Sequence, residues 1–137
     1  MNPCFTHLAM HVRDLDACIA FYRDLCRLEI AHERGSGDDR VVWLSERGRE
    51  RDFVFVLISG GTLGEQDDRD FGHLGFAVHS RREVDEIAER ARQMGCLVWE
   101  PRDEPYPVGY YCGVRDPNGR IVEMSHGQPL GPGASEV

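Results

Sequence analysis

The sequence predicts an α+β fold in which two tandem βαβββ modules form a half-closed mixed-sheet barrel around a metal cavity. Residues 5–12 and 71–78 are alike: each segment places a histidine two residues after a phenylalanine and ends in a valine. The two histidines are 66 residues apart, and each is followed by helix-like and then strand-like stretches. A repeat at a fixed offset indicates one structural unit used twice.

The first module covers about residues 4–59. Alternation over residues 4–12 predicts a strand, and Asp14 or Asp16 can cap the helix that follows. The apolar face of this helix recurs at spacings of three and four residues, at Cys18, Phe21, Tyr22, Leu25 and Leu28. Three further strands are expected over residues 28–32, 41–45 and 53–59.

The second module covers about residues 71–126 and repeats this order. After a strand at 71–79, Ser80 and Glu83 have the spacing of a capping box. The helix then carries an apolar stripe of Val84, Ile87, Ala88, Ala91 and Met94, and Gly95 ends it. The remaining strands are expected over residues 96–100, 108–115 and 120–126.

The polar, glycine-bearing residues 60–70 are interpreted as a linker between the modules. Residues 127–137 have little to pack and are expected to form a mobile tail. The chain of 137 residues is read as a single domain, and its 41% hydrophobic and 29% charged residues are ordinary for a soluble globular protein.

Charge and hydropathy exclude several classes of partner. A net charge of −8 argues against nucleic acid, which is bound mainly through Lys and Arg. No apolar run approaches the roughly 20 residues of a membrane span, so no membrane partner is expected. The N-terminus lacks the pattern of a signal peptide. The five scattered cysteines, without a C-x-x-C pair, suit free thiols in a reducing cytoplasm.

His7, His73 and Glu123 are the predicted metal ligands. The histidines occupy the same phase of the repeat, and the small residues Ala9 and Gly75 beside them leave room for a ligand. Two imidazoles and one carboxylate suit a divalent metal with open coordination positions. The alternative is that both histidines are ordinary half-buried residues and that the glutamate is solvated.

A tight turn at Asp116-Pro117-Asn118-Gly119 is expected to join the last two strands. If 116 pairs with 119, then Glu123 faces Cys112. The same register makes Tyr110 share the face of Glu123, because directly opposed residues point to the same side. The Tyr110 phenol is therefore a catalytic candidate that could donate to a metal-bound substrate oxygen.

His11 and His79 share the inward phase of their strands, and each is a candidate general base or substrate hydrogen-bond partner; the alternative is a position at the cavity rim. The repeat also predicts the counterpart of Glu123, because an offset of 66 residues gives Leu57. Residues 53–61 contain no acid, amide or histidine. Three protein ligands with open positions are typical of a catalytic metal site.

Three motifs carry a family resemblance: the segment from His7 to Asp14, the helical Phe21-Tyr22-Arg-Asp-Leu25, and residues 115–123 with their Asp-Pro-Asn-Gly turn and final glutamate. Over about residues 4–126, the chain resembles the vicinal oxygen chelate superfamily. That group holds glyoxalase I, methylmalonyl-CoA epimerases, fosfomycin-resistance thiol transferases, extradiol dioxygenases and bleomycin-binding proteins.

The resemblance implies that His7, His73 and Glu123 fall on the superfamily's metal positions. Glyoxalase I and the epimerases have a fourth protein ligand, at the position where this chain has Leu57. A set of two histidines and one glutamate is similar to that of the extradiol dioxygenases and fosfomycin transferases instead.

The function expected is that of a cytoplasmic, divalent-metal-dependent enzyme whose small substrate chelates the metal through vicinal oxygens. Dioxygenase or group-transfer chemistry is favoured, with Fe²⁺ or Mn²⁺; Zn²⁺ or Ni²⁺ would suit the alternative, a glyoxalase I-like lyase or isomerase. A second alternative is a metal-free, bleomycin-resistance-like binding protein. A homodimer is expected, because an open apolar sheet face is costly in water. The paired halves could come from one chain or be swapped between two.

Overall fold

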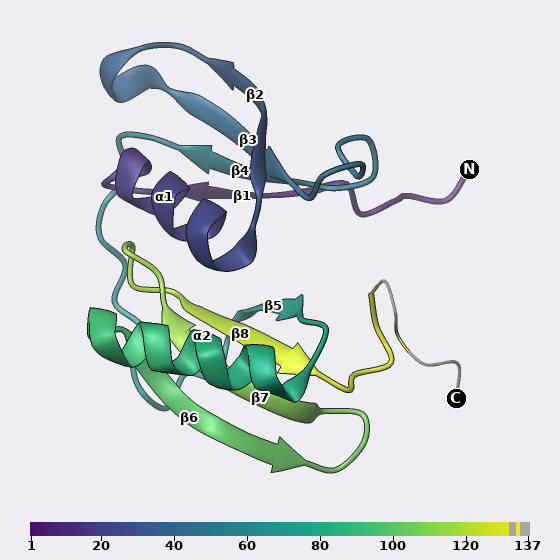
Figure 1. Cartoon of the computed structure of the whole chain (residues 1–137). Helices are drawn as coiled ribbons and strands as arrows, with labels where there is room; N and C mark the ends of the chain where they lie inside the picture. Colours follow the sequence, from purple (N-terminus) through teal and green to yellow (C-terminus); the bar gives the residue numbers. More distant parts are fainter. Residues whose placement is uncertain (132–133, 135–137) are drawn as a thin grey trace. The chain divides into compact units, whose positions relative to one another are not determined.

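The computed structural model describes residues 1–131 and 134 of the chain, which divides into two compact units between Gly64 and Glu65. The boundary falls inside the segment predicted as a linker. Each unit contains a four-stranded mixed sheet and one long helix, in the order βαβββ (Figure 1). The predicted α+β fold with two tandem βαβββ modules is confirmed.

The first unit has the strand order β1-β4-β3-β2, with β1 and β4 parallel and the other pairs antiparallel. Its elements are β1 (His7–His11), α1 (Leu15–Cys26), β2 (Glu29–Arg34), the short 3₁₀ helix η1 (Gly37–Asp39), β3 (Val41–Ser45) and β4 (Val54–Ile58).

Helix α1 is capped by Asp14, whose carboxylate accepts a hydrogen bond from the amide of Ala17 at 3.0 Å. Asp16, the alternative cap, pairs with Arg40 instead. The apolar face of α1 packs on one side of the sheet, where the rings of Tyr22 and Phe55 lie edge to face, 4.8 Å apart between centroids. Helix α1 does not cover the opposite side of the sheet (Figure 1).

The second unit repeats this arrangement with the strand order β5-β8-β7-β6, β5 and β8 being parallel. Its elements are β5 (Leu74–Ala77), α2 (Arg81–Met94), β6 (Leu97–Glu104), β7 (Gly109–Arg115) and β8 (Ile121–His126).

The hydroxyl of Ser80 caps α2 by accepting from the amide of Glu83, whose carboxylate in turn accepts from the backbone N–H of His79. The predicted capping box is thus present, but the Glu83 carboxylate bonds the N–H of His79 instead of the N–H of Ser80. Gly95 ends the helix with φ 75°. Met94, expected on the apolar stripe, is exposed, because it lies in the last turn beyond the sheet-facing residues.

Among the described residues, neither helix combines the length and the apolar character that crossing a membrane requires. Residues 132–133 and 135–137 of the predicted mobile tail lie outside the described part of the chain.

Candidate metal centre

The second unit brings together two of the three predicted ligands. His73 directly precedes β5, Glu123 is the third residue of β8, and their side chains approach to 3.5 Å between Nε2 and Oε2. Parallel pairing of Gly75 with Glu123 places the carboxylate beside β5. A Cβ at position 75 would stand 3.5 Å from Oε2 of Glu123, which is ordinary van der Waals contact.

A backbone contact favours one tautomer of His73. Its Nδ1 lies 2.7 Å from the carbonyl oxygen of Phe71. A carbonyl can only accept, so Nδ1 carries the hydrogen, and Nε2 of the neutral ring holds the lone pair. That lone pair is on the side of Glu123. This is the form of histidine that binds a metal, oriented by a hydrogen bond from its other nitrogen.

The Glu123 side chain is only 8% exposed, yet its polar contacts are weak. Apart from His73, its carboxylate is approached by the amide Nε2 of Gln128, again at 3.5 Å. Burial of a carboxylate costs free energy unless strong partners compensate it. A divalent cation would supply that compensation, so the donor set fits a metal ion on the chemistry of its own residues.

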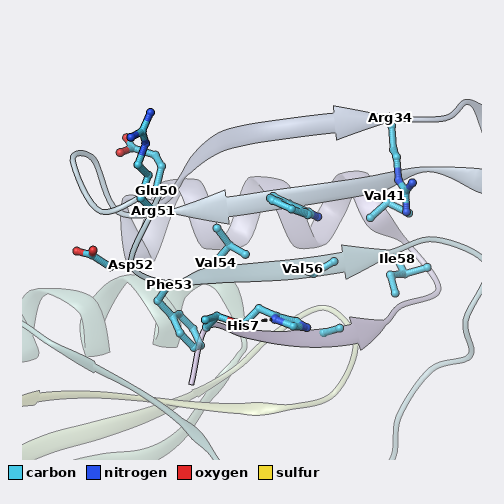
Figure 2. A pocket seen from close by; sticks show the side chains of 13 residues that line it. His7, Arg34, Val41, Glu50, Arg51, Asp52, Phe53, Val54, Val56 and Ile58 are labelled. Carbon is cyan, nitrogen blue, oxygen red and sulfur yellow. Dashed lines mark hydrogen bonds between the residues drawn. The ribbon is translucent and has the colours of Figure 1, made fainter. Parts of the chain in front are cut away.

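His7 begins β1 in the first unit, and its side chain lies on the open face of that sheet. Its Nδ1 is 2.9 Å from the hydroxyl oxygen of Thr6, so its Nε2 is also the nitrogen available for a ligand. The imidazole lines a cavity of about 400 Å³ (Figure 2).

This cavity has an apolar floor and charged ends. Glu50, Arg51 and Asp52 lie at one end and Arg34 lies at the other (Figure 2). Besides His7 and Arg34, the strand residues that line it are Ala9, Val41, Trp43, Val54, Val56 and Ile58.

Strand pairing corrects the predicted counterpart of Glu123. In the second unit Gly75 pairs with Glu123, and in the first unit Ala9, the counterpart of Gly75, pairs with Val56. Val56 rather than Leu57 therefore occupies the matching position. Leu57 is fully buried in the core on the face of α1. Matching residues of the two units are 66 positions apart at β1 and 67 positions apart at β4. The counterpart of Glu123 is apolar, as expected.

The predicted register of the last hairpin is wrong by one residue. Gly113, not Cys112, lies opposite Glu123. The turn is one residue longer than expected, because Asp116 pairs with Arg120: its amide donates to the Arg120 carbonyl at 2.7 Å. The carboxylate of Asp116 holds this wider turn by accepting from the amides of Asn118 and Arg120.

Tyr110 therefore lies on the face of α2 and not on the face of Glu123. Its hydroxyl donates to Asp85 of α2, and the Arg81 guanidinium stands 4.0 Å above its ring. The Asp85 contact raises the pKa of the Tyr110 phenol. Cys112 is buried on the same side, where desolvation raises the pKa of its thiol to about 12. The geometric reason for Tyr110 as a catalytic residue is removed.

The other two catalytic candidates lie at different points of the fold. Nε2 of His11 donates to the carbonyl of Ser59 at 3.0 Å, just after β4. His79 contributes its backbone N–H to the cap of α2, and its side chain is exposed. These contacts leave Nδ1 of His11 as the ring nitrogen that could accept a proton.

The sequence prediction missed an aromatic group beside His73 and Glu123. Trp99 of β6 lies over Gly113 and contacts the rings of Phe71, His73 and Tyr111. Gly113 was the available signal, because a glycine inside a strand often marks the close approach of another group.

Neither unit alone gathers three His, Cys, Asp or Glu side chains into a possible metal cluster among residues 1–131 and 134. The predicted set of three takes His7 from the first unit and the other two ligands from the second.

Comparison with known proteins agrees with the fold. The sequence model of the Glyoxalase/Bleomycin resistance protein/Dioxygenase superfamily matches residues 5–124. Uncharacterized protein PA2024 of Pseudomonas aeruginosa is 55% identical over 137 residues, which cover 100% of this chain and 98% of the relative.

Two solved structures illustrate the structural likeness. The fosfomycin resistance protein FosX of Listeria monocytogenes has a TM-score of 0.73 at 21% identity, with 93% of this chain and 96% of FosX covered. A glyoxylase/bleomycin resistance protein/dioxygenase domain from Frankia sp. EAN1pec has a TM-score of 0.68 at 23% identity, with 93% and 100% covered.

Proposed function

This chain belongs to the Glyoxalase/Bleomycin resistance protein/Dioxygenase superfamily, and we propose that it is a divalent-metal-dependent enzyme acting on a small molecule with two neighbouring oxygen atoms. The observation that carries the proposal is the state of Glu123. Its carboxylate is nearly buried, and the partners described for it stand 3.5 Å away, beside the lone pair of His73. Such a group is costly without a cation.

The proposed ligands are His7, His73 and Glu123. A set of two imidazoles and one carboxylate favours Fe²⁺ or Mn²⁺. Mn²⁺ has support from a relative, because FosX of Listeria monocytogenes was solved as a complex with Mn(II). Another FosX complex holds Mn(II) with dihydroxypropylphosphonic acid, whose two hydroxyls are on neighbouring carbons. When bound, the metal would act as a Lewis acid on the substrate oxygens.

The protein's own residues contribute orientation and charge. The Phe71 carbonyl holds the His73 ring in the tautomer that leaves Nε2 open. Glu123 supplies one negative charge, so the site would keep about +1 with a divalent ion, which favours a substrate oxyanion. The apolar floor of the cavity beside His7 would hold the substrate body away from water.

The reaction proposed is dioxygenation or group transfer rather than the lyase reaction of glyoxalase I. The position matching Glu123 in the first unit is Val56, which cannot carry a proton. A glyoxalase I-like lyase or isomerase stays as the alternative, in which His11 or His79 would move the proton.

The test begins with the metal content of protein purified without added metal. Mn²⁺, Fe²⁺, Zn²⁺ and Ni²⁺ are then titrated, and oxygen-chelating substrates are screened with and without air. Glu123→Ala and His73→Ala should lose the metal. His32→Ala and Glu86→Ala, which change exposed residues of the same types, should retain it. Absence of divalent-metal binding in the parent protein would favour the metal-free binding protein instead.

A mixing experiment identifies which chains furnish the ligands. His7→Ala and His73→Ala proteins each lack one ligand of every site. If the sites are swapped between two chains of the proposed homodimer, mixed dimers regain one intact site; if each site lies within one chain, they regain none.

A further inference from the structure

Trp99 occupies the side-chain space that Gly113 leaves on the sheet. The two residues pair across β6 and β7, and a Cβ at position 113 would stand 2.5 Å from Cε3 of the indole. Gly113 is in turn directly opposite Glu123 across β7 and β8. The indole is therefore held over the sheet beside the carboxylate, on the face away from α2.

The indole also contacts His73. Its ring centroid lies 5.6 Å from that of the imidazole, and the two planes are nearly perpendicular, at 85°. Phe71 and Tyr111 contact the indole at 6.2 and 6.3 Å between centroids. The ring that touches the proposed metal ligand is thus itself held by two further aromatic side chains.

We propose that Trp99 is the positioning residue of His73, an inference that rests on the proposed function. The imidazole is one-third exposed, and its described hydrogen bond is a single bond, from Nδ1 to the Phe71 carbonyl. The second side-chain torsion of histidine has a broad energy well, so one hydrogen bond leaves the ring angle loosely defined. The edge-on indole limits that rotation and keeps Nε2 toward Glu123.

The first unit shows that this arrangement is not a general feature of the module. In the first unit, the position that corresponds to Gly113 is held by Trp43, which pairs with Val56. The position that corresponds to Trp99 is held by His32, which pairs with Trp43. Among the described residues, a glycine that admits a tryptophan from the neighbouring strand occurs only in the half that carries the buried carboxylate. Packing of the sheet alone does not require it, since the first sheet forms without it.

The experiment compares Mn²⁺ affinity in four proteins: the parent, Trp99→Leu, Gly113→Ala and the double variant. Free Mn²⁺ is measured by electron paramagnetic resonance. Loss of an orienting neighbour of a metal ligand typically weakens affinity 10- to 100-fold, and that loss is expected for Trp99→Leu. Gly113→Ala should weaken binding by displacing the indole, so it should add little to the effect of Trp99→Leu.

Two further variants complete the comparison. Trp43→Phe, which changes an indole that contacts His32 and lines the cavity beside His7, is the background for a fluorescence measurement. It leaves Trp99 as the single tryptophan, because the chain has two, so Mn²⁺ should quench its fluorescence. Trp99→Phe, which keeps a ring against His73, should recover part of the affinity.

A measurement without metal separates this inference from the proposed function. Nitrogen-15 resonances of His73 should show the single Nδ1–H tautomer in the neutral parent ring and a mixture in Trp99→Leu. Unchanged affinity or an unchanged single tautomer in that variant would overturn the positioning role. If the parent binds no Mn²⁺, the proposed function fails, and the tautomer comparison still decides whether Trp99 orients His73.

Discussion

Oε2 of Glu123 lies 3.5 Å from Nε2 of His73, although the two residues are 50 positions apart in the chain. Parallel pairing of β5 with β8 produces this approach, because it sets Gly75 against Glu123 and brings the residue before β5 to the same edge. The contact is longer than a good hydrogen bond. Without a cation, the carboxylate therefore loses most of its hydration and gains little in return.

Glu123→Gln keeps the shape of the side chain and removes its charge. In metal-free protein, we expect the melting temperature to stay the same or rise, because an under-compensated buried charge is gone. Added Mn²⁺ should raise the melting temperature of the parent and leave that of the variant unchanged, since only a bound ligand stabilises the fold. Thermal unfolding with and without Mn²⁺ measures both effects. Full metal occupancy in the variant would mean that Glu123 is not a ligand.

Tyr110→Phe tests the face on which this residue lies. The hydroxyl bonds Asp85 on the side of α2, so its removal should lower the free energy of unfolding by up to about 1 kcal/mol. Mn²⁺ affinity should be unchanged. Chemical denaturation and metal titration of the same sample measure the two quantities. A tenfold loss of metal affinity at full stability would place the phenol at the metal centre after all.

Cys112 makes stability depend on alkaline pH. Desolvation raises the pKa of its thiol from 9.0 to about 12 in the folded chain. The contribution of the buried, protonated thiol is therefore complete below pH 9 and is lost as the pH rises toward 12, because the unfolded chain ionises first. The decline for one group is at most about 1.4 kcal/mol per pH unit.

The difference in unfolding free energy between the parent and Cys112→Ala should accordingly shrink above pH 9. Denaturant titrations at several pH values measure it. Cys4→Ala, which changes an exposed thiol, serves as the control and should show a constant difference. A parallel decline for Cys112→Ala and the parent would contradict the assignment.

Local periodicity was enough to predict the order of the strands, both helices and their caps, because these depend on spacing within a few residues. It did not predict the full length of β6, which was expected over residues 96–100 and runs to Glu104. The pairing register was not predictable in the same way. The carboxylate of Asp116 accepts two amides and widens the turn by one residue, which moves Tyr110 and Cys112 to the opposite face. The contact of Trp99 with His73 joins segments 26 residues apart, and the glycine at position 113 was its one signal in the sequence.

Val56→Glu tests whether the first unit holds a vacant ligand position. Val56 matches Glu123 by strand pairing and is 7% exposed, so a carboxylate there should lower the stability of metal-free protein by about 1–3 kcal/mol. A fourth protein ligand should then strengthen metal binding and enlarge the metal-dependent rise in melting temperature. Activity on the glutathione adduct of methylglyoxal, expected to be weak or absent in the parent, should increase, because a second carboxylate can carry a proton.

Leu57→Glu is the matched control, since it makes the same kind of change one residue further along. Leu57 is fully buried on the face of α1, where its pairing partner is Met10. A carboxylate at that position should unfold the first unit or lower its stability severely, and added metal should not rescue it. Circular dichroism and Mn²⁺ titration compare the two variants directly. Equal metal affinity of Val56→Glu and the parent, in folded protein, would show that the position matching Glu123 does not face the metal.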